Sequence, residues 1–189
     1  MKRFRAAPLA LLLAALALGV TACSPKKDQA PPQPKVTAAV KGAAAPVAAL
    51  PVLGVAPAWK LQDVNGAAVT SEQLKGKVVV LDFWATWCPP CREEIPGYIA
   101  LQKKYGQDGV ALVGVSLDQA GPGVVKEFAA KFGINYQMLM ADDAVIAAFG
   151  GVEAIPTTFL IDRTGKIRDR KVGSEPTAEY EKKIQALLN

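Results

Sequence analysis

The segment KVVVLDFWATWCPPCREE, residues 77–94, carries the clearest structural pattern in the chain. After Lys77, the run to Phe83 holds three consecutive valines and is apolar apart from one aspartate, which is typical of a strand buried on both faces. A helix is predicted to begin at Pro89, because proline suits the first helical turn, where its missing N–H has no partner to lose. This helix is expected to reach Tyr105, with Gly106 after its end. A buried strand followed directly by a helix indicates an α/β fold.

The sequence after residue 56 alternates between strand and helix patterns. Strands are expected at 110–115, 136–139, 157–162 and 166–172, helices at 124–132, 144–149 and 176–188, and an N-terminal hairpin around Asn65-Gly66. This order predicts an α/β layer fold with a central mixed sheet flanked by helices.

Composition and charge exclude several classes of function. The chain has no histidine, which excludes Ser-His-Asp and Cys-His catalysis and His-ligated zinc or haem. Three cysteines are too few for a Cys₄ zinc or iron–sulfur site within one chain. The net charge of +5 belongs to the N-terminal part, since residues 56–189 hold 15 Lys and Arg against 16 Asp and Glu. The folded part therefore lacks the positive excess expected of a nucleic-acid-binding protein.

Residues 1–22 are predicted to be an export signal of the lipoprotein type. A basic start precedes an uncharged run, 6–23, dominated by Leu and Ala. The run ends in VTAC and so resembles the lipobox of bacterial lipoproteins, in which the chain is cut before a cysteine, here Cys23, that is then acylated. The alternative is an uncleaved membrane anchor, although the 18 uncharged residues are at the lower limit for a spanning helix. Both interpretations place the rest of the chain on the periplasmic side of a bacterial membrane.

Residues 23–56 are predicted to be a lipid-anchored tether. Prolines are spread among Ala, Val and Lys, and no aromatic residue is present. Such a segment cannot bury enough apolar surface to offset the entropy lost on ordering. The folded domain is therefore expected to span residues 57–189.

Cys88 and Cys91 lie three residues apart at the predicted helix start, where they can form a small-ring disulfide. The free N–H groups of the first turn and the helix dipole stabilise a thiolate there and lower the thiol pKa. Because only the thiolate attacks a disulfide, Cys88 is predicted to be the nucleophile and Cys91, one turn further in, the resolving cysteine. A structural disulfide would close too short a loop to remove much unfolded-state entropy, and zinc would need further ligands that the chain mostly lacks.

Residues 83–94, FWATWCPPCREE, resemble the active-site stretch of the thioredoxin superfamily, and AIPTTF at 154–159 strengthens the match. The N-terminal hairpin and the extra segment around 121–150 resemble the exported TlpA/ResA branch. The resemblance implies a thioredoxin-like fold and thiol–disulfide oxidoreductase activity without a metal or an organic cofactor. It also implies that the bond before Pro156 is cis and faces the dithiol, which leaves the Ile155 backbone free to pair with a bound peptide.

Four further residues complete the predicted site. Asp82 is the one charged residue in a run expected to be buried, and burial raises the pKa of a carboxyl group. In thioredoxins an aspartate six positions before the first cysteine handles the proton of the resolving cysteine; the alternative is a strand-end aspartate that reaches solvent or a loop amide. Glu94 matches a glutamate that tunes thiol protonation in ResA-like proteins, although an early-turn glutamate also suits the helix dipole. Trp87 and Pro89 are expected to form part of the substrate-docking surface, and Trp84 to lie in the core.

The sequence thus predicts a membrane-tethered, extracytoplasmic thiol–disulfide oxidoreductase. The resemblance suggests the haem-site cysteines of apocytochrome c as substrates and a membrane thiol-reducing protein as electron donor. One alternative is peroxide reduction, for which the usual Thr-x-x-Cys spacing is not met, since Thr86 lies only two residues before Cys88. The other is a copper(I) chaperone for respiratory oxidases, which the lack of histidine and of a nearby methionine weakens.

Overall fold

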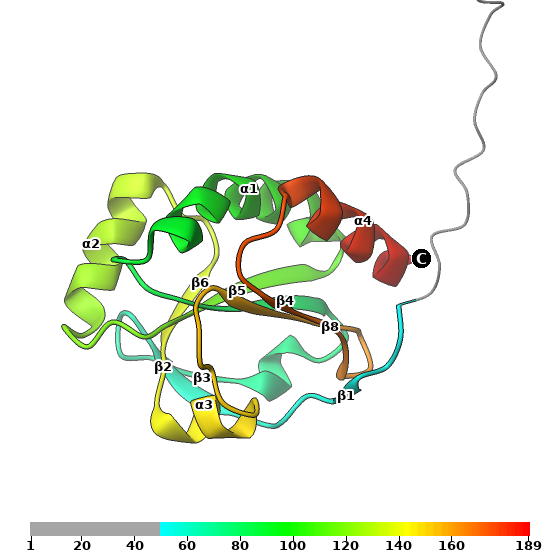
Figure 1. Cartoon of the computed structure of the whole chain (residues 1–189), viewed down its shortest axis with the longest axis horizontal. Helices are drawn as coiled ribbons and strands as arrows, with labels where there is room; N and C mark the ends of the chain where they lie inside the picture. Colours follow the sequence, from blue (N-terminus) through cyan, green and yellow to red (C-terminus); the bar gives the residue numbers. More distant parts are fainter. Residues whose placement is uncertain (1–49) are drawn as a thin grey trace, which may run out of the picture. The chain divides into compact units, whose positions relative to one another are not determined.

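The computed structural model of the protein describes residues 50–189, so the predicted signal, Cys23 and most of the tether lie outside the described residues. Figure 1 shows one sheet with helices on both of its faces. The sheet has eight strands in the order β1-β8-β7-β4-β5-β6-β2-β3, with both parallel and antiparallel neighbours. The predicted α/β class and the mixed sheet are therefore confirmed.

The elements follow the predicted order closely. The strands are β1 (Gly54–Val55), β2 (Lys60–Asp63), β3 (Ala68–Thr70), β4 (Val78–Trp84), β5 (Val110–Ser116), β6 (Gln137–Met140), β7 (Thr157–Ile161) and β8 (Lys166–Val172). The α-helices are α1 (Pro89–Tyr105), α2 (Pro122–Phe132), α3 (Asp143–Ala148) and α4 (Thr177–Leu188). Strands β2 and β3 form the predicted hairpin. None of the helices in residues 50–189 combines the length and the apolar character needed to cross a membrane.

Strand β4 lies at the centre of the sheet and positions the site. It pairs parallel with β5 and antiparallel with β7, and all of its residues are buried, as its β-branched composition predicts. Because side chains alternate along a strand, Val78 and Val80 pack in the core beneath α1 and α4. Val79, Leu81 and Phe83 fill the opposite core, which α3 covers. The same alternation turns the side chain of residue 82 toward α1 and α4.

The ordered part of the chain begins earlier than the predicted boundary at residue 57. Strand β1 lies within the segment assigned to the tether and pairs with β8, with Gly54 opposite Ile167. The Arg168 guanidinium also donates hydrogen bonds to the carbonyl oxygens of Leu50 and Pro51. Without β1, strand β8 would be a longer exposed edge with unpaired backbone groups. A two-residue strand is too short to leave a periodic pattern in the sequence, which is why composition alone did not reveal it.

Candidate active site

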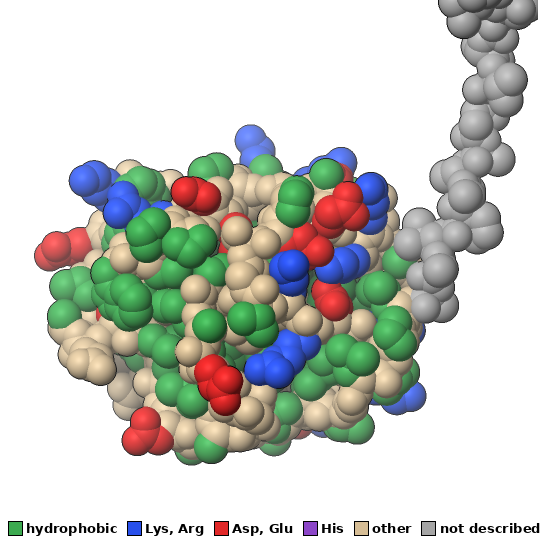
Figure 2. Space-filling view, viewed as in Figure 1, with side chains coloured by type: hydrophobic (Ala, Val, Ile, Leu, Met, Phe, Trp, Pro, Cys, Tyr) green, Lys and Arg blue, Asp and Glu red, His purple; other side chains and the backbone are tan. Residues whose placement is uncertain are grey.

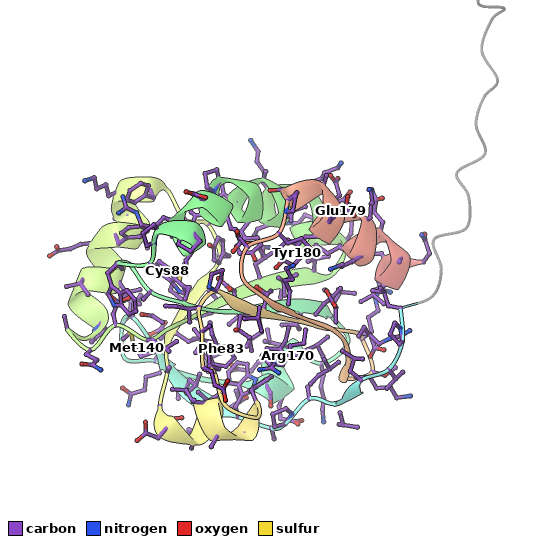
Figure 3. All side chains as sticks on the ribbon, viewed as in Figure 1. Phe83, Cys88, Met140, Arg170, Glu179 and Tyr180 are labelled. Atoms are coloured by element: carbon purple, nitrogen blue, oxygen red, sulfur yellow. A yellow bond between two sulfur atoms is a disulfide. The ribbon has the colours of Figure 1, made fainter. Side chains whose placement is uncertain are left out.

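The dithiol lies at the first turn of α1, where Figure 3 labels Cys88. Cys88 is the N-cap residue, and its sulfur accepts a hydrogen bond from the Cys91 backbone N–H at 3.3 Å. The two cysteines form a disulfide, with their Cα atoms 5.4 Å apart, and the prolines between them occupy the first two helical positions. Both residues are buried in this oxidised form, since only 3% of Cys88 and 1% of Cys91 is accessible. What separates the two is the cap position, which aims the helix dipole at the Cys88 sulfur.

The loop before β7 meets the dithiol from the other side. The Ile155–Pro156 peptide bond is cis, as the resemblance implied. The Cys88 sulfur lies 3.8 Å from the Ile155 carbonyl oxygen, although 67 residues separate them in the chain. The loop is anchored by hydrogen bonds from Thr157 Oγ1 to the Ala154 carbonyl at 2.7 Å and from the Gly173 N–H to the Pro156 carbonyl at 2.8 Å. A backbone edge is thus held against the reactive sulfur.

Asp82 lies in β4, beneath α1, and only 7% of it is accessible. Thr158 of β7 is its direct partner in the antiparallel register, and the Thr158 hydroxyl donates to Asp82 Oδ1 at 3.1 Å. Burial, and then the negative charge of Glu94, raise the pKa of Asp82 to about 8, although the Thr158 hydrogen bond acts in the opposite sense. Asp82 therefore does not reach solvent or a loop amide, and the prediction that it is buried with a raised pKa is confirmed.

Glu94 also faces the interior. It lies one turn beyond Cys91 on α1, and 6% of it is accessible. Its Oε1 accepts a hydrogen bond from the Glu175 backbone N–H at 2.9 Å. Burial raises the pKa of Glu94 to about 7, whereas the Glu175 N–H and the positive charge of Lys171 act to lower it. Two carboxyl groups near the dithiol helix thus titrate close to neutral pH, a range suited to exchanging protons with thiols.

Sequence reasoning missed Asp118, which holds the active-site loop. This buried residue follows β5 and accepts hydrogen bonds from the Thr86 N–H at 2.9 Å and the Thr86 hydroxyl at 2.5 Å. The Ser116 hydroxyl donates to it at 2.8 Å. The signal available in the sequence was a single aspartate directly after an apolar strand, but only the strand order places it beside the loop that follows β4. The Thr86 hydroxyl, two residues before Cys88, is fully engaged in this contact.

The tryptophans that flank the loop divide as predicted. Trp84 is 2% accessible and packs in the core, whereas Trp87 is 65% accessible. Pro89 is also exposed, so an exposed apolar residue lies on each side of the buried Cys88 in the sequence. A groove of about 340 Å³ lies beside Trp87 and is lined by the segment 117–120. Figure 2 shows hydrophobic side chains gathered over the α2 side of the molecule, with acidic and basic side chains interspersed elsewhere on this face.

The structure places Cys88, Cys91 and the cis Ile155–Pro156 bond together at the start of α1. Asp82 and Glu94 are neighbours of each other. The predicted docking roles of Trp87 and Pro89 are supported by their exposure alone. Within residues 50–189, no cluster of three or more Asp, Glu or Cys side chains is arranged to hold a metal ion.

Comparisons with known proteins agree with this geometry. The profile of the AhpC/TSA family matches residues 52–170. The chain is 33% identical over 126 residues to the thiol-disulfide oxidoreductase ResA of Bacillus thuringiensis, which covers 67% of this chain and 72% of that protein. It is 36% identical over 131 residues to the thioredoxin-like protein YneN of Bacillus subtilis, covering 68% and 76%. A solved thiol:disulfide interchange protein of the thioredoxin family from Chlorobium tepidum superimposes with a TM-score of 0.67 at 35% identity, covering 72% of this chain and 97% of that one. The predicted thioredoxin-like fold is confirmed.

Proposed function

Because this chain belongs to the AhpC/TSA family and is a thiol–disulfide oxidoreductase, we propose that its substrates are disulfides of exported proteins. The observation that carries the proposal is the place of Cys88, which caps α1 and lies 3.8 Å from the Ile155 carbonyl. A peptide paired with the Ile155 backbone would bring its own disulfide against the Cys88 sulfur. The exposed Trp87 and the adjoining groove supply apolar surface for the residues that flank the substrate cysteine.

The reaction follows from the two thiol environments. In the reduced enzyme the Cys88 thiolate attacks one sulfur of the substrate disulfide, and the other sulfur leaves as a thiolate. Cys91 then loses its proton and attacks the Cys88 sulfur of the mixed disulfide, which releases the second substrate thiolate. The enzyme is left with the Cys88–Cys91 disulfide, two electrons have passed to the substrate, and a membrane thiol-reducing donor must return the enzyme to its reduced form.

Separate replacement of the two cysteines tests the order of attack. Cys88→Ser should abolish reduction of a protein disulfide, because no thiolate remains at the helix start. Cys91→Ser should accumulate mixed disulfides, since attack still occurs but release does not. Both outcomes can be read on non-reducing gels after mixing with an oxidised protein substrate. Equal trapping by the two variants would contradict the assigned order.

The substrate class we propose includes the haem-site cysteines of apocytochrome c. The support for this is the family resemblance in the active-site stretch, and the trapped complexes of Cys91→Ser provide the test. Mass spectrometry of those complexes from a membrane preparation should identify cytochrome c precursors. Their absence, with other exported proteins trapped instead, would remove this substrate and keep the reductase activity.

We further propose that the domain works on the periplasmic side of a membrane, held there by a lipid on Cys23. Cys23→Ala should abolish lipid modification of the protein, measured as the loss of labelling by a radioactive fatty acid. Labelling that is unchanged by the substitution, or that never occurs, would contradict lipid attachment and favour an uncleaved anchor.

A further inference from the structure

A line of buried hydroxyl groups connects the two carboxyl groups of the site. Thr158 Oγ1 lies 3.1 Å from Asp82 Oδ1 and 3.3 Å from the Tyr98 hydroxyl. Tyr98 is one turn beyond Glu94 on α1, which places the two side chains on the same face of the helix, and the nearby Tyr98 hydroxyl acts to lower the pKa of Glu94. All four residues are buried. The groups therefore follow one another from β4, across β7, to α1.

The donors and acceptors along this line can be assigned in two complementary ways. Each hydroxyl has one hydrogen to donate and can accept another hydrogen bond at the same time. When Asp82 is ionised, Thr158 donates to it, Tyr98 donates to Thr158, and a protonated Glu94 can donate to Tyr98. When Asp82 is protonated, all three donations reverse, and Tyr98 donates to an ionised Glu94. Either hydroxyl can be the donor in the contact between Tyr98 and Thr158, so both arrangements fit the positions of the atoms.

Glu94, at the end of the line opposite Asp82, has a carboxylate oxygen that can accept a hydrogen bond. Glu94 Oε1 is engaged by the Glu175 N–H, whereas Oε2 is buried and has no hydrogen-bond partner among the described residues. A buried carboxylate oxygen without a partner is unfavourable, so the Tyr98 hydrogen is the natural one for it to receive. Glu94 lies beside the segment that precedes α4, because its Oε1 is bonded to the Glu175 N–H.

We propose that Thr158 and Tyr98 relay the resolving-step proton from Asp82 to Glu94. The inference rests on the proposed function, because the proton originates on Cys91 during reduction of a disulfide. Cys91 gives its proton to the Asp82 carboxylate and attacks the mixed disulfide. Asp82 then passes a proton to Thr158 as Thr158 passes its own to Tyr98 and Tyr98 passes its own to Glu94. Asp82 ends ionised and Glu94 protonated, and neither hydroxyl gains or loses a proton overall.

The relay gives the buried Asp82 a route by which to lose its proton. Asp82 lies in the central strand with neighbours on both sides, and only 7% of it is accessible, so solvent has little direct access to its proton. Tyr98, Tyr136 and Tyr180 surround the two carboxyls, and Figure 3 shows Tyr180 between α4 and the sheet. Tyr136 is a neighbour of both acids, but its hydroxyl is not part of the line. The remaining charges that act on Glu94 are Glu175, which raises its pKa, and Lys171, which lowers it.

Rapid mixing of the full-length reduced protein with a symmetrical nitroaryl disulfide tests the relay. Attack by Cys88 releases one coloured thiolate, and attack by Cys91 releases the second, so the two steps are recorded separately. The test variants are Tyr98→Phe and Thr158→Val, which remove one hydroxyl each and keep most of the side-chain shape. Tyr136→Phe is the matched control, because it removes a neighbouring hydroxyl whose ring lies 6.4 Å from that of Tyr98. Thr158→Ser restores the hydroxyl at position 158.

The expected result is a change in the second step only. At pH 7 a carboxyl with a pKa of about 8 is ionised in about a tenth of the molecules. In both test variants the molecules with ionised Asp82 should resolve promptly. The molecules with protonated Asp82 should resolve at least about tenfold more slowly, because Asp82 must lose its proton without the relay. Wild type, Tyr136→Phe and Thr158→Ser should show one fast phase. At pH 9, where Asp82 is largely ionised before mixing, all variants should resolve at similar rates.

Three outcomes would overturn the relay. The first is a second step in Tyr98→Phe that matches Tyr136→Phe at pH 7. The second is a single phase whose pH midpoint alone has moved, because that reports an electrostatic effect on Asp82 and no interrupted transfer. The third is a wild-type protein that forms the mixed disulfide and never resolves it, which removes the proposed function together with the relay. In the first two outcomes the wild type still reduces the disulfide, so the proposed function stands.

Discussion

Asp82 illustrates how far a single residue can be understood from its place in the sequence. A lone carboxyl in an apolar strand predicted burial and a raised pKa, and the structure confirms both. The alternation of side chains also places it on the α1 face. Its partners could not be predicted in this way. Thr158 is opposite Asp82 only because β7 pairs antiparallel with β4 in one register, and Glu94 is a neighbour only because α1 packs over that register.

Asp82→Asn should slow the resolving step more than the first attack. Cys91 needs a nearby base, whereas the Cys88 thiolate is stabilised by the helix start and needs none. The same rapid-mixing experiment measures both steps, and an expected loss on the order of a hundredfold in the second step follows from the usual contribution of a general base. If Asp82→Asn slows only the first attack, the base is Glu94 or water.

The same substitution should stabilise the fold, with a pH dependence that identifies the cause. The folded pKa of about 8 exceeds the unfolded value of 3.8, so between these values the folded state binds more protons than the unfolded state. Stability therefore falls as pH rises from about 4 to 8, and Asn removes this loss. Asp82→Asn should raise the free energy of unfolding by on the order of 2–4 kcal/mol at pH 8 and by much less at pH 5. Urea denaturation at the two pH values measures this; equal gains at both would contradict it.

At the scale of elements, the hairpin of β7 and β8 is closed by one carboxyl group. Asp162 Oδ1 accepts hydrogen bonds from the Thr164 N–H at 2.9 Å, the Thr164 hydroxyl at 2.7 Å and the Lys166 N–H at 3.0 Å. Its Oδ2 pairs with Arg168 at 2.9 Å. Burial acts to raise the pKa of Asp162, but these hydrogen bonds outweigh it and lower the pKa to about 2. The turn is therefore stabilised by a carboxylate that stays ionised in mild acid.

Asp162→Asn should destabilise the protein by about 2 kcal/mol at pH 7, because the charged acceptor of several hydrogen bonds is lost. The folded pKa is below the unfolded value, so this stabilisation is present above pH 4 and is lost as pH falls toward 2. Thermal unfolding at pH 7 and pH 3 measures the difference. The exposed Asp143 at the start of α3 provides the control, since Asp143→Asn should change stability little. A loss that is the same at both pH values would assign the effect to packing.

Helices and strands could be predicted where a buried apolar run is bounded by glycine or proline. β4, β5, α1 and β8 were placed within about a residue, because apolar runs mark the strands and Gly or Pro marks their ends. Contacts between distant segments were not predictable. The Asp118 clamp on Thr86 depends on the loop after β4 lying beside the end of β5, and no local pattern encodes that proximity.

At the scale of the whole molecule, strand β1 forms the edge of the sheet beside β8. The sequence predicted that the two residues of β1 belong to the tether. The Leu53 N–H donates to the Ile167 carbonyl at 2.8 Å and the Ala56 N–H to the Gly165 carbonyl at 2.9 Å. Arg168 links this segment to the hairpin turn, because it binds Leu50, Pro51 and Asp162 together. Residues 50–56 are therefore part of the folded domain in energetic terms.

A chain that begins at residue 57 should be less stable than one that begins at residue 50. The shorter chain loses the β1 pairing and leaves Arg168, whose side chain is only 19% accessible, without two of its acceptors. At about 1 kcal/mol for each net hydrogen bond, the expected loss is on the order of 3 kcal/mol. Urea denaturation of the two chains measures it, and Arg168→Lys in the longer chain separates the guanidinium contacts from the strand pairing. Equal midpoints for the two chains would place the domain boundary at residue 57, because β1 would then add no stability to the edge of β8.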